Sequence, residues 1–73
     1  MKTCKVKCAY DDEANVWVAV AEKGVGLVLE SGNLDELKER VSLALPEMLE
    51  LNYGYIGEVE IIFEEVPIDE FIE

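Results

Sequence analysis

Residues 2–21 have the sequence KTCKVKCAYDDEANVWVAVA, and this stretch decides the fold. Residues 2–10 and residues 16–21 each alternate with a period of two, which predicts two strands that each bury one face. Between them, the acidic run at 11–15 has the composition of a turn. The short connection predicts that the two strands form a β-hairpin.

Two more strands are indicated further along the chain, at residues 25–30 and 57–66. If the first and fourth strands are neighbours, Lys5 and Lys7 face glutamates of the fourth strand, and opposite charges are paired. A helix between the third and fourth strands returns the chain, so the fourth strand runs parallel to the first. We therefore predict an α+β fold of order β-β-β-α-β, in which a four-stranded mixed sheet of order 3-2-1-4 carries one main helix on one face.

The helix has the clearest start signal in the sequence. Asn33 is a preferred N-cap residue, and Glu36 stands three residues later. Apolar residues then recur at three- and four-residue spacing, which predicts an amphipathic helix that ends near Asn52. Pro46 should kink or break this helix, because proline lacks an N–H and its ring clashes with the preceding turn.

Length and net charge limit the number of domains and the classes of partner. The 73 residues suffice for one small domain, so we expect a single domain over 1–73 whose residues 68–73 form a helical turn or an ordered tail. The net charge of −11 disfavours nucleic acid, whose phosphates need lysine and arginine. Such a charge attracts a basic protein, although it can also serve solubility alone.

The uncovered face of the sheet is the first candidate contact surface. If the valines of residues 16–20 face the core, the opposite face carries an apolar set of Trp17, Ala19, Ala21, Val28 and Ile62. Exposed apolar patches often mark contact surfaces, so these residues indicate an oligomer or partner interface. In the alternative interpretation, the C-terminal tail covers Trp17 through Phe71 and Ile72.

A second candidate surface is acidic and would meet a basic partner. It combines carboxylates of the predicted turn with those of the fourth strand, namely Asp11, Asp12, Glu13, Glu58, Glu60 and Glu64. The three turn residues are adjacent in sequence, whereas a calcium loop spaces more ligands around a glycine-containing bend. We therefore expect a solvated turn and no metal site there.

The residue types present do not predict catalysis. The chain has no histidine, the usual general base and the commonest transition-metal ligand. Cys4 and Cys8 would lie roughly 13 Å apart on one strand, too far for a disulfide. Reduced cysteines fit the cytoplasm, and neither a signal peptide nor a membrane span is indicated. We expect no catalytic residue, no cofactor and no metal.

Three stretches resemble HicB-like domains. The stretch from Tyr10 to Val18 resembles their first hairpin, Gly26-Leu27-Val28 resembles their third strand, and residues 30–37 resemble their helix start. The likeness runs from about Val6 to about Leu51 and is greatest to short stand-alone members of uncharacterised function. Two positions depart from the usual pattern, since Val25 replaces a proline and Asn33 replaces a capping threonine.

The resemblance implies a truncated ribonuclease-H-like fold and the role of an antitoxin. HicB antitoxins bind and mask HicA, a small basic RNA-cleaving toxin, so a HicA-like protein is the partner that the resemblance implies. Full HicB proteins carry a DNA-binding segment after the fourth strand. Residues 67–73 contain no basic side chain, so we expect no direct binding to nucleic acid.

Two hypotheses follow from these observations. The leading one is a non-catalytic acidic module that binds a basic toxin and assembles as a homo-oligomer, a dimer or tetramer. The alternative is an orphan oligomeric scaffold or small-ligand-binding domain that lacks the antitoxin role. A neighbouring reading frame for a small basic protein would favour the first.

Overall fold

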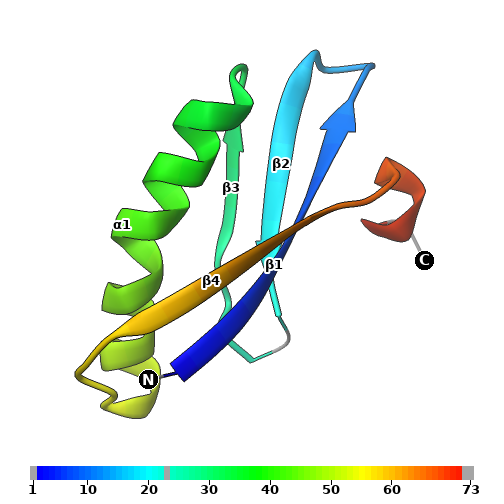
Figure 1. The fold of residues 1–73 in the computed structure, drawn as a ribbon. Helices are drawn as coiled ribbons and strands as arrows, with labels where there is room; N and C mark the ends of the chain where they lie inside the picture. The colour runs from blue at the N-terminus through cyan, green and yellow to red at the C-terminus, as the bar shows by residue number, and fades with distance from the viewer. Residues whose placement is uncertain (1, 23, 72–73) are drawn as a thin grey trace.

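The computed structural model describes residues 2–22 and 24–71. Its four strands are β1 (Lys2–Asp11), β2 (Val16–Ala21), β3 (Val28–Ser31) and β4 (Val59–Glu65), and its helices are α1 (Leu34–Tyr53) and the short 3-10 helix η1 (Ile68–Phe71). The strands form one sheet of order β3-β2-β1-β4, in which β1 pairs antiparallel with β2 and parallel with β4 (Figure 1). The predicted α+β fold and strand order are confirmed.

The hairpin between β1 and β2 is closed by its own polar side chains. Asp11 Oδ1 accepts hydrogen bonds from the backbone N–H groups of Glu13 and Ala14, at 3.0 and 3.3 Å. Asn15 adopts a left-handed conformation with φ 57°, which asparagine tolerates better than most residues. The acidic run therefore makes a turn, as predicted, and uses Asp11 to hold it.

Helix α1 is capped at both ends. Asn33 Oδ1 accepts a hydrogen bond from the Glu36 N–H at 3.0 Å, which confirms the predicted N-cap. At the other end, Gly54 has φ 67° and donates its N–H to the Glu50 carbonyl oxygen at 2.9 Å. Pro46 lies inside a helix that runs from residue 34 to residue 53, so it does not divide the element. Within the described ranges, no helix has the length and apolar composition of a membrane span.

The core lies between α1 and one face of the sheet. Leucine and valine side chains of the helix pack on small side chains of the central strands. The fully buried helix residues are Leu37, Val41, Leu45 and Leu49, and the strand residues beneath them are Cys4, Val6, Cys8, Ala19 and Ala21. Because cysteine and alanine are small, the helix can approach the sheet closely there.

The faces of β2 are the reverse of those expected. In the antiparallel register, Cys8 is opposite Ala19 and Tyr10 is opposite Trp17, so Trp17 and Ala19 lie on the helix-covered face. Ala19 is 1% exposed, and Trp17 packs against the core. The expectation that Trp17, Ala19 and Ala21 form an uncovered surface is wrong, because a period of two defines two faces without saying which is buried.

Strand β3 begins later than the sequence suggested. Val25 and Leu27 are buried in the core cluster, but they precede the strand, which starts at Val28. Gly26 has φ 79°, a conformation that interrupts an extended strand. The side chain of Asn52 donates to the Val25 carbonyl oxygen at 2.9 Å and ties this loop to the end of α1. The predicted strand at 25–30 is therefore a loop followed by a short strand.

Candidate protein-binding surface

The face of the sheet opposite α1 is partly apolar and partly charged. The pairing registers place Val28, Val20, Lys7 and Glu64 in one row across the four strands. Val28 is 60% exposed, whereas its neighbour Val20 is half-buried. Ile62 belongs to the same face and is 39% exposed. The structure thus confirms that Val28 and Ile62 lie on the uncovered face, on its two outer strands.

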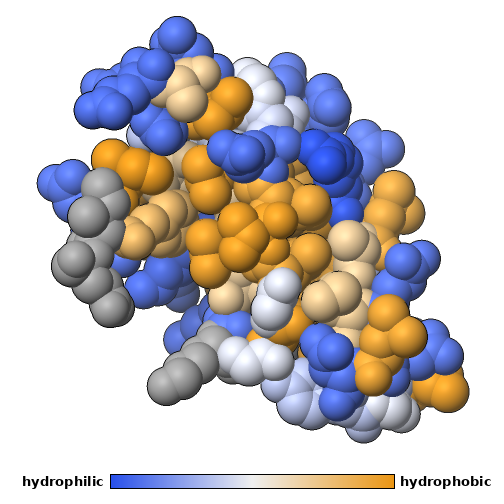
Figure 2. Space-filling model, turned by 180° about the vertical axis from the view of Figure 1, so that it is seen from behind, coloured by the Kyte–Doolittle hydropathy of each residue, from blue (hydrophilic) through white to orange (hydrophobic). Residues whose placement is uncertain are grey.

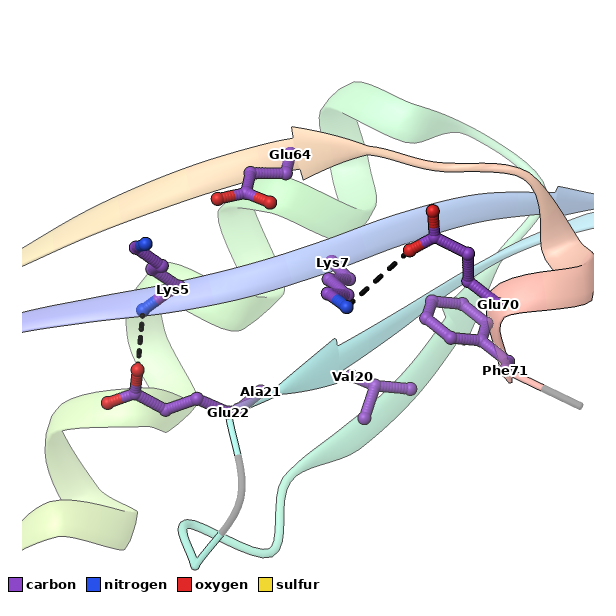
Figure 3. A pocket seen from close by; sticks show the side chains of 8 residues that line it. All are labelled: Lys5, Lys7, Val20, Ala21, Glu22, Glu64, Glu70 and Phe71. Atoms are coloured by element: carbon purple, nitrogen blue, oxygen red, sulfur yellow. Dashed lines mark hydrogen bonds and ion pairs between the residues drawn. The ribbon is translucent and has the colours of Figure 1, made fainter. Parts of the chain in front are cut away.

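The C-terminal turn η1 lies over part of this face. Figure 3 shows Glu70 and Phe71 of η1 beside Lys7 and Val20. Together with the strands, η1 borders an open hollow of about 480 Å³, lined by Lys5, Lys7, Val20, Ala21, Glu22, Glu64, Glu70 and Phe71. The tail therefore does cover an apolar part of the sheet, although on the face opposite to Trp17. Ile72 lies outside the described residues.

The charges of the hollow are only partly matched. Lys7 Nζ is 3.5 Å from Glu70 Oε2, and both side chains are about half exposed. Glu22 Oε2 accepts a hydrogen bond from the Lys5 backbone N–H at 3.5 Å. Among the described residues, Glu64 has no cationic group within 4.0 Å, although Lys7 is its neighbour across the strands. The hollow is therefore an open, mixed-charge surface with an unpaired carboxylate at one side.

The acidic candidates do not form one site. Asp11, Asp12 and Glu13 lie at the β1–β2 turn, beyond the residue that pairs with the end of β4. Glu58 precedes the opposite end of β4, where its carbonyl oxygen accepts from the Lys2 N–H at 3.1 Å. Between these ends, the side chains of Glu60 and Glu64 alternate with Ile62 on the uncovered face. Carboxylates thus line β4 and the far end of its neighbour β1.

Sequence reasoning missed several residues of this region. Glu22, Glu70 and Phe71 border the hollow, and no sequence pattern links them, because they come together through the sheet and the tail. It also missed an exposed apolar group at the end of α1 and in the loop after it. Leu51, Tyr53 and Ile56 are 81, 56 and 80% exposed. Leu51 and Tyr53 belong to the last turn of α1, and Ile56 lies in the loop that follows Gly54.

The back of the molecule shows how apolar and polar residues are distributed. In Figure 2, hydrophobic residues gather in the middle of the view and reach its lower right margin, with hydrophilic residues between and around them. Val28 and Ile62 are among the large apolar side chains that remain exposed on the open face of the sheet. They lie on the outer strands β3 and β4, with Lys5 and Lys7 of β1 between them, so apolar and charged positions are interspersed on this face.

The thiols are placed for packing. Cys4 and Cys8 are both 0% exposed, on the face covered by α1. Burial raises the pKa of each thiol, which keeps it protonated and unreactive. Among the described residues, no group of three histidine, cysteine or acidic side chains is arranged to hold a metal.

Comparison with known proteins gives a family and a structural relative. A hypothetical protein from the extremely thermophilic bacterium Thermus thermophilus has a crystal structure similar to this one, with a TM-score of 0.77 and 36% sequence identity. The match covers 89% of this chain and 93% of that chain. No curated protein matches the sequence. Residues 3–67 match the model of a domain of unknown function, DUF1902, so the chain belongs to this HicB-like family.

Proposed function

We propose that this protein is a non-catalytic acidic module that binds and masks a small basic protein, an RNA-cleaving toxin of the HicA class. One observation carries the proposal. The chain has 17 acidic and 6 basic residues, and in the described part a single ion pair, Lys7–Glu70, matches a carboxylate with a cation. The other carboxylates of the described part form no ion pair and can therefore meet the cations of a basic partner.

The physical argument concerns competition for a basic surface. A protein that binds RNA presents lysine and arginine to the phosphates. An acidic protein attracts the same side chains, speeds the encounter and covers the surface that RNA needs. Membership of a HicB-like family supports this class of partner. Masking by contact requires no reaction on this chain.

The absence of catalysis is part of the proposal. The two thiols of the chain, Cys4 and Cys8, are buried with raised pKa values, so neither is a ready nucleophile. The sequence contains no histidine to act as a general base. The carboxylates and aliphatic side chains that β4 exposes then serve as a contact surface for the partner.

The test is capture of the partner from a lysate of the source cell, with this protein as bait and mass spectrometry as the readout. We expect a small basic protein that elutes at raised salt, because salt screens exposed charges. Purified bait should then suppress RNA cleavage by that protein in an equimolar mixture. Capture of no basic protein, or undiminished RNA cleavage, would contradict the proposal.

A second candidate function is a homo-oligomeric scaffold. It is favoured by the exposure of Val28, which continues the apolar row of Val20 on the uncovered face. The test is the solution mass by light scattering for the wild-type protein and for a Val28→Glu variant. A wild-type dimer or tetramer that the substitution dissociates would support a scaffold. A wild-type monomer would exclude it.

A further inference from the structure

We propose that the free edge of β4 is the docking edge for the basic partner, which adds a strand whose side chains alternate between basic and apolar. This inference rests on the proposed function, because it assigns the contact site of the same partner. Strand β4 is an outer strand of the sheet, and its seven residues make it longer than the other outer strand, β3 (Figure 1). An exposed edge offers backbone groups that a partner strand can pair with.

The hydrogen bonds to β1 show which backbone groups of β4 face outward. The Lys2 N–H donates to the Glu58 carbonyl oxygen at 3.1 Å, and the Val66 N–H donates to the Cys8 carbonyl oxygen at 2.9 Å. Successive residues of a strand direct their N–H and C=O groups to opposite sides, so even-numbered residues from 58 to 66 face β1. The groups that face outward are those of Val59, Ile61, Phe63 and Glu65.

The side chains of β4 define what the added strand must carry. On the uncovered face it would lie beside Glu60 and Glu64, neither of which has a cation within 4.0 Å among the described side chains. Lys7, the neighbour of Glu64, is held by Glu70 at 3.5 Å. Basic side chains on this face of the added strand would therefore meet unpaired carboxylates.

The other face of β4 favours apolar side chains. Val59, Ile61 and Phe63 pack against the core but stay partly exposed. The β1 neighbours of Ile61 and Phe63, Cys4 and Val6, are fully buried. Helix α1 lies closer to β2 and β3 than to β4, and Lys38 Nζ of α1 is 5.5 Å from the centre of the Phe63 ring, so this margin of the core is only partly covered. Apolar side chains of an added strand would complete it.

A second copy of this chain is a poor occupant of the same edge. Antiparallel pairing of two β4 strands about Ile62 would place Glu60 of one copy opposite Glu64 of the other, on both sides of the centre. Like charges directly opposite are destabilising in a sheet. In this register, charge complementarity favours a basic strand over self-association.

The experiment uses the full chain and a short peptide of alternating lysine and valine, and it follows backbone amide hydrogen exchange by NMR. We expect the peptide to slow exchange at the outward amides of Val59, Ile61, Phe63 and Glu65. The amides of Glu60, Ile62 and Glu64 already bond to β1 and should change little. Slowed exchange at β3 instead, or none on β4, would overturn the proposal.

Charge variants test the same edge with a matched control. The double variant Glu60→Gln, Glu64→Gln should bind the peptide about fivefold more weakly, since two exposed pairs together contribute about 1 kcal/mol. The control Glu39→Gln, Glu47→Gln removes the same charge from exposed positions of α1 and should lose clearly less affinity. Equal losses of peptide affinity in the two variants would show that the peptide responds only to net charge, and would contradict docking at the edge of β4. Melting curves of both variants verify that they fold.

The two proposals can fail separately. If a basic partner is captured from lysate but leaves the outward amides of β4 unprotected, the proposed function stands and the docking edge is wrong. If the peptide protects those amides but no basic partner exists in the cell, the docking edge stands and the proposed function is wrong. Protection of these amides in the free protein at high concentration would assign the edge to a second copy.

Discussion

Lys7 on β1 forms its ion pair with Glu70 of η1, with 3.5 Å between Nζ and Oε2, although Glu64 is its neighbour across the β1–β4 register. This choice has two consequences. It helps hold the C-terminal turn over the uncovered face of the sheet. It also leaves the Glu64 carboxylate without a cation within 4.0 Å among residues 2–22 and 24–71. The tail and the acidic edge of β4 are therefore linked through one lysine.

The first prediction concerns this ion pair. Glu70→Gln should lower the free energy of unfolding by less than about 1 kcal/mol, because both partners are about half exposed and salt and water screen them. Lys7 is then released toward Glu64, so affinity for a basic peptide should fall. Urea denaturation and peptide titration measure the two effects. A loss of more than about 2 kcal/mol would show that the tail contributes far more than its ion pair.

The second prediction concerns Trp17, which packs against the core and meets Tyr10 edge-on, with 5.4 Å between ring centres. Trp17→Ala should destabilise the protein by about 2–4 kcal/mol, because it leaves a cavity at the margin of the core. The solution mass by light scattering should stay the same. If the variant kept the stability of the wild type but had a lower solution mass, Trp17 would belong to an oligomer interface instead.

The third prediction tests the start of α1. Asn33→Ala should cost about 1 kcal/mol in the free energy of unfolding, because the Glu36 N–H loses its acceptor. Asn33→Asp keeps an acceptor oxygen and is the matched control, with a change of a few tenths of that amount. Chemical denaturation of both variants measures the difference. Equal stability of the alanine variant and the wild type would mean that the cap contributes nothing.

The fourth prediction follows from the buried thiols. Burial raises the pKa values of Cys4 and Cys8 in the folded state, so the unfolded chain loses these protons first as pH rises. Stability from the thiols is therefore complete below pH 9.0, the ordinary pKa of a cysteine, and declines above it. Urea denaturation across this range measures the decline. A Cys4→Ala, Cys8→Ala variant should show a flatter dependence, and an equally steep one would assign the decline to other groups.

Local signals in the sequence predicted much of the fold. The N-cap at Asn33 and the turn held by Asp11 depend on residues within three positions of each other, so the sequence contains the whole interaction. The parallel pairing of β1 and β4 was also predictable, because lysines on one strand suit glutamates on the other. Those glutamates lie where they were expected, on the uncovered face.

The buried face of β2 could not be predicted from its pattern. Both of its faces are apolar, one with valines and the other with Trp17, Ala19 and Ala21. The choice depends on the hairpin register, which places Ala19 opposite Cys8 beneath the leucines of α1. Small side chains are favoured at this position because the helix packs closely on the sheet there. This requirement depends on tertiary packing and is not visible in the pattern of one strand.

The candidate surface was predictable only in part. The sequence identified Val28, Ile62 and the β4 glutamates, which alternate along strands. It could not identify Glu70 and Phe71, because a turn after Pro67 brings them back over β1 and β2. Nor could it show that Lys7 pairs with this turn and not with Glu64. Contacts between a tail and a sheet depend on where the chain folds back.

The most direct test of the central claim is titration calorimetry of this protein with the small basic protein captured from its source cell, at low and at raised salt. We predict tight binding at about 0.05 M salt and an affinity at least about tenfold weaker at about 0.5 M, where the Debye length is much shorter. An affinity that does not change with salt, or no binding at low salt, would contradict an acidic module that masks a basic partner.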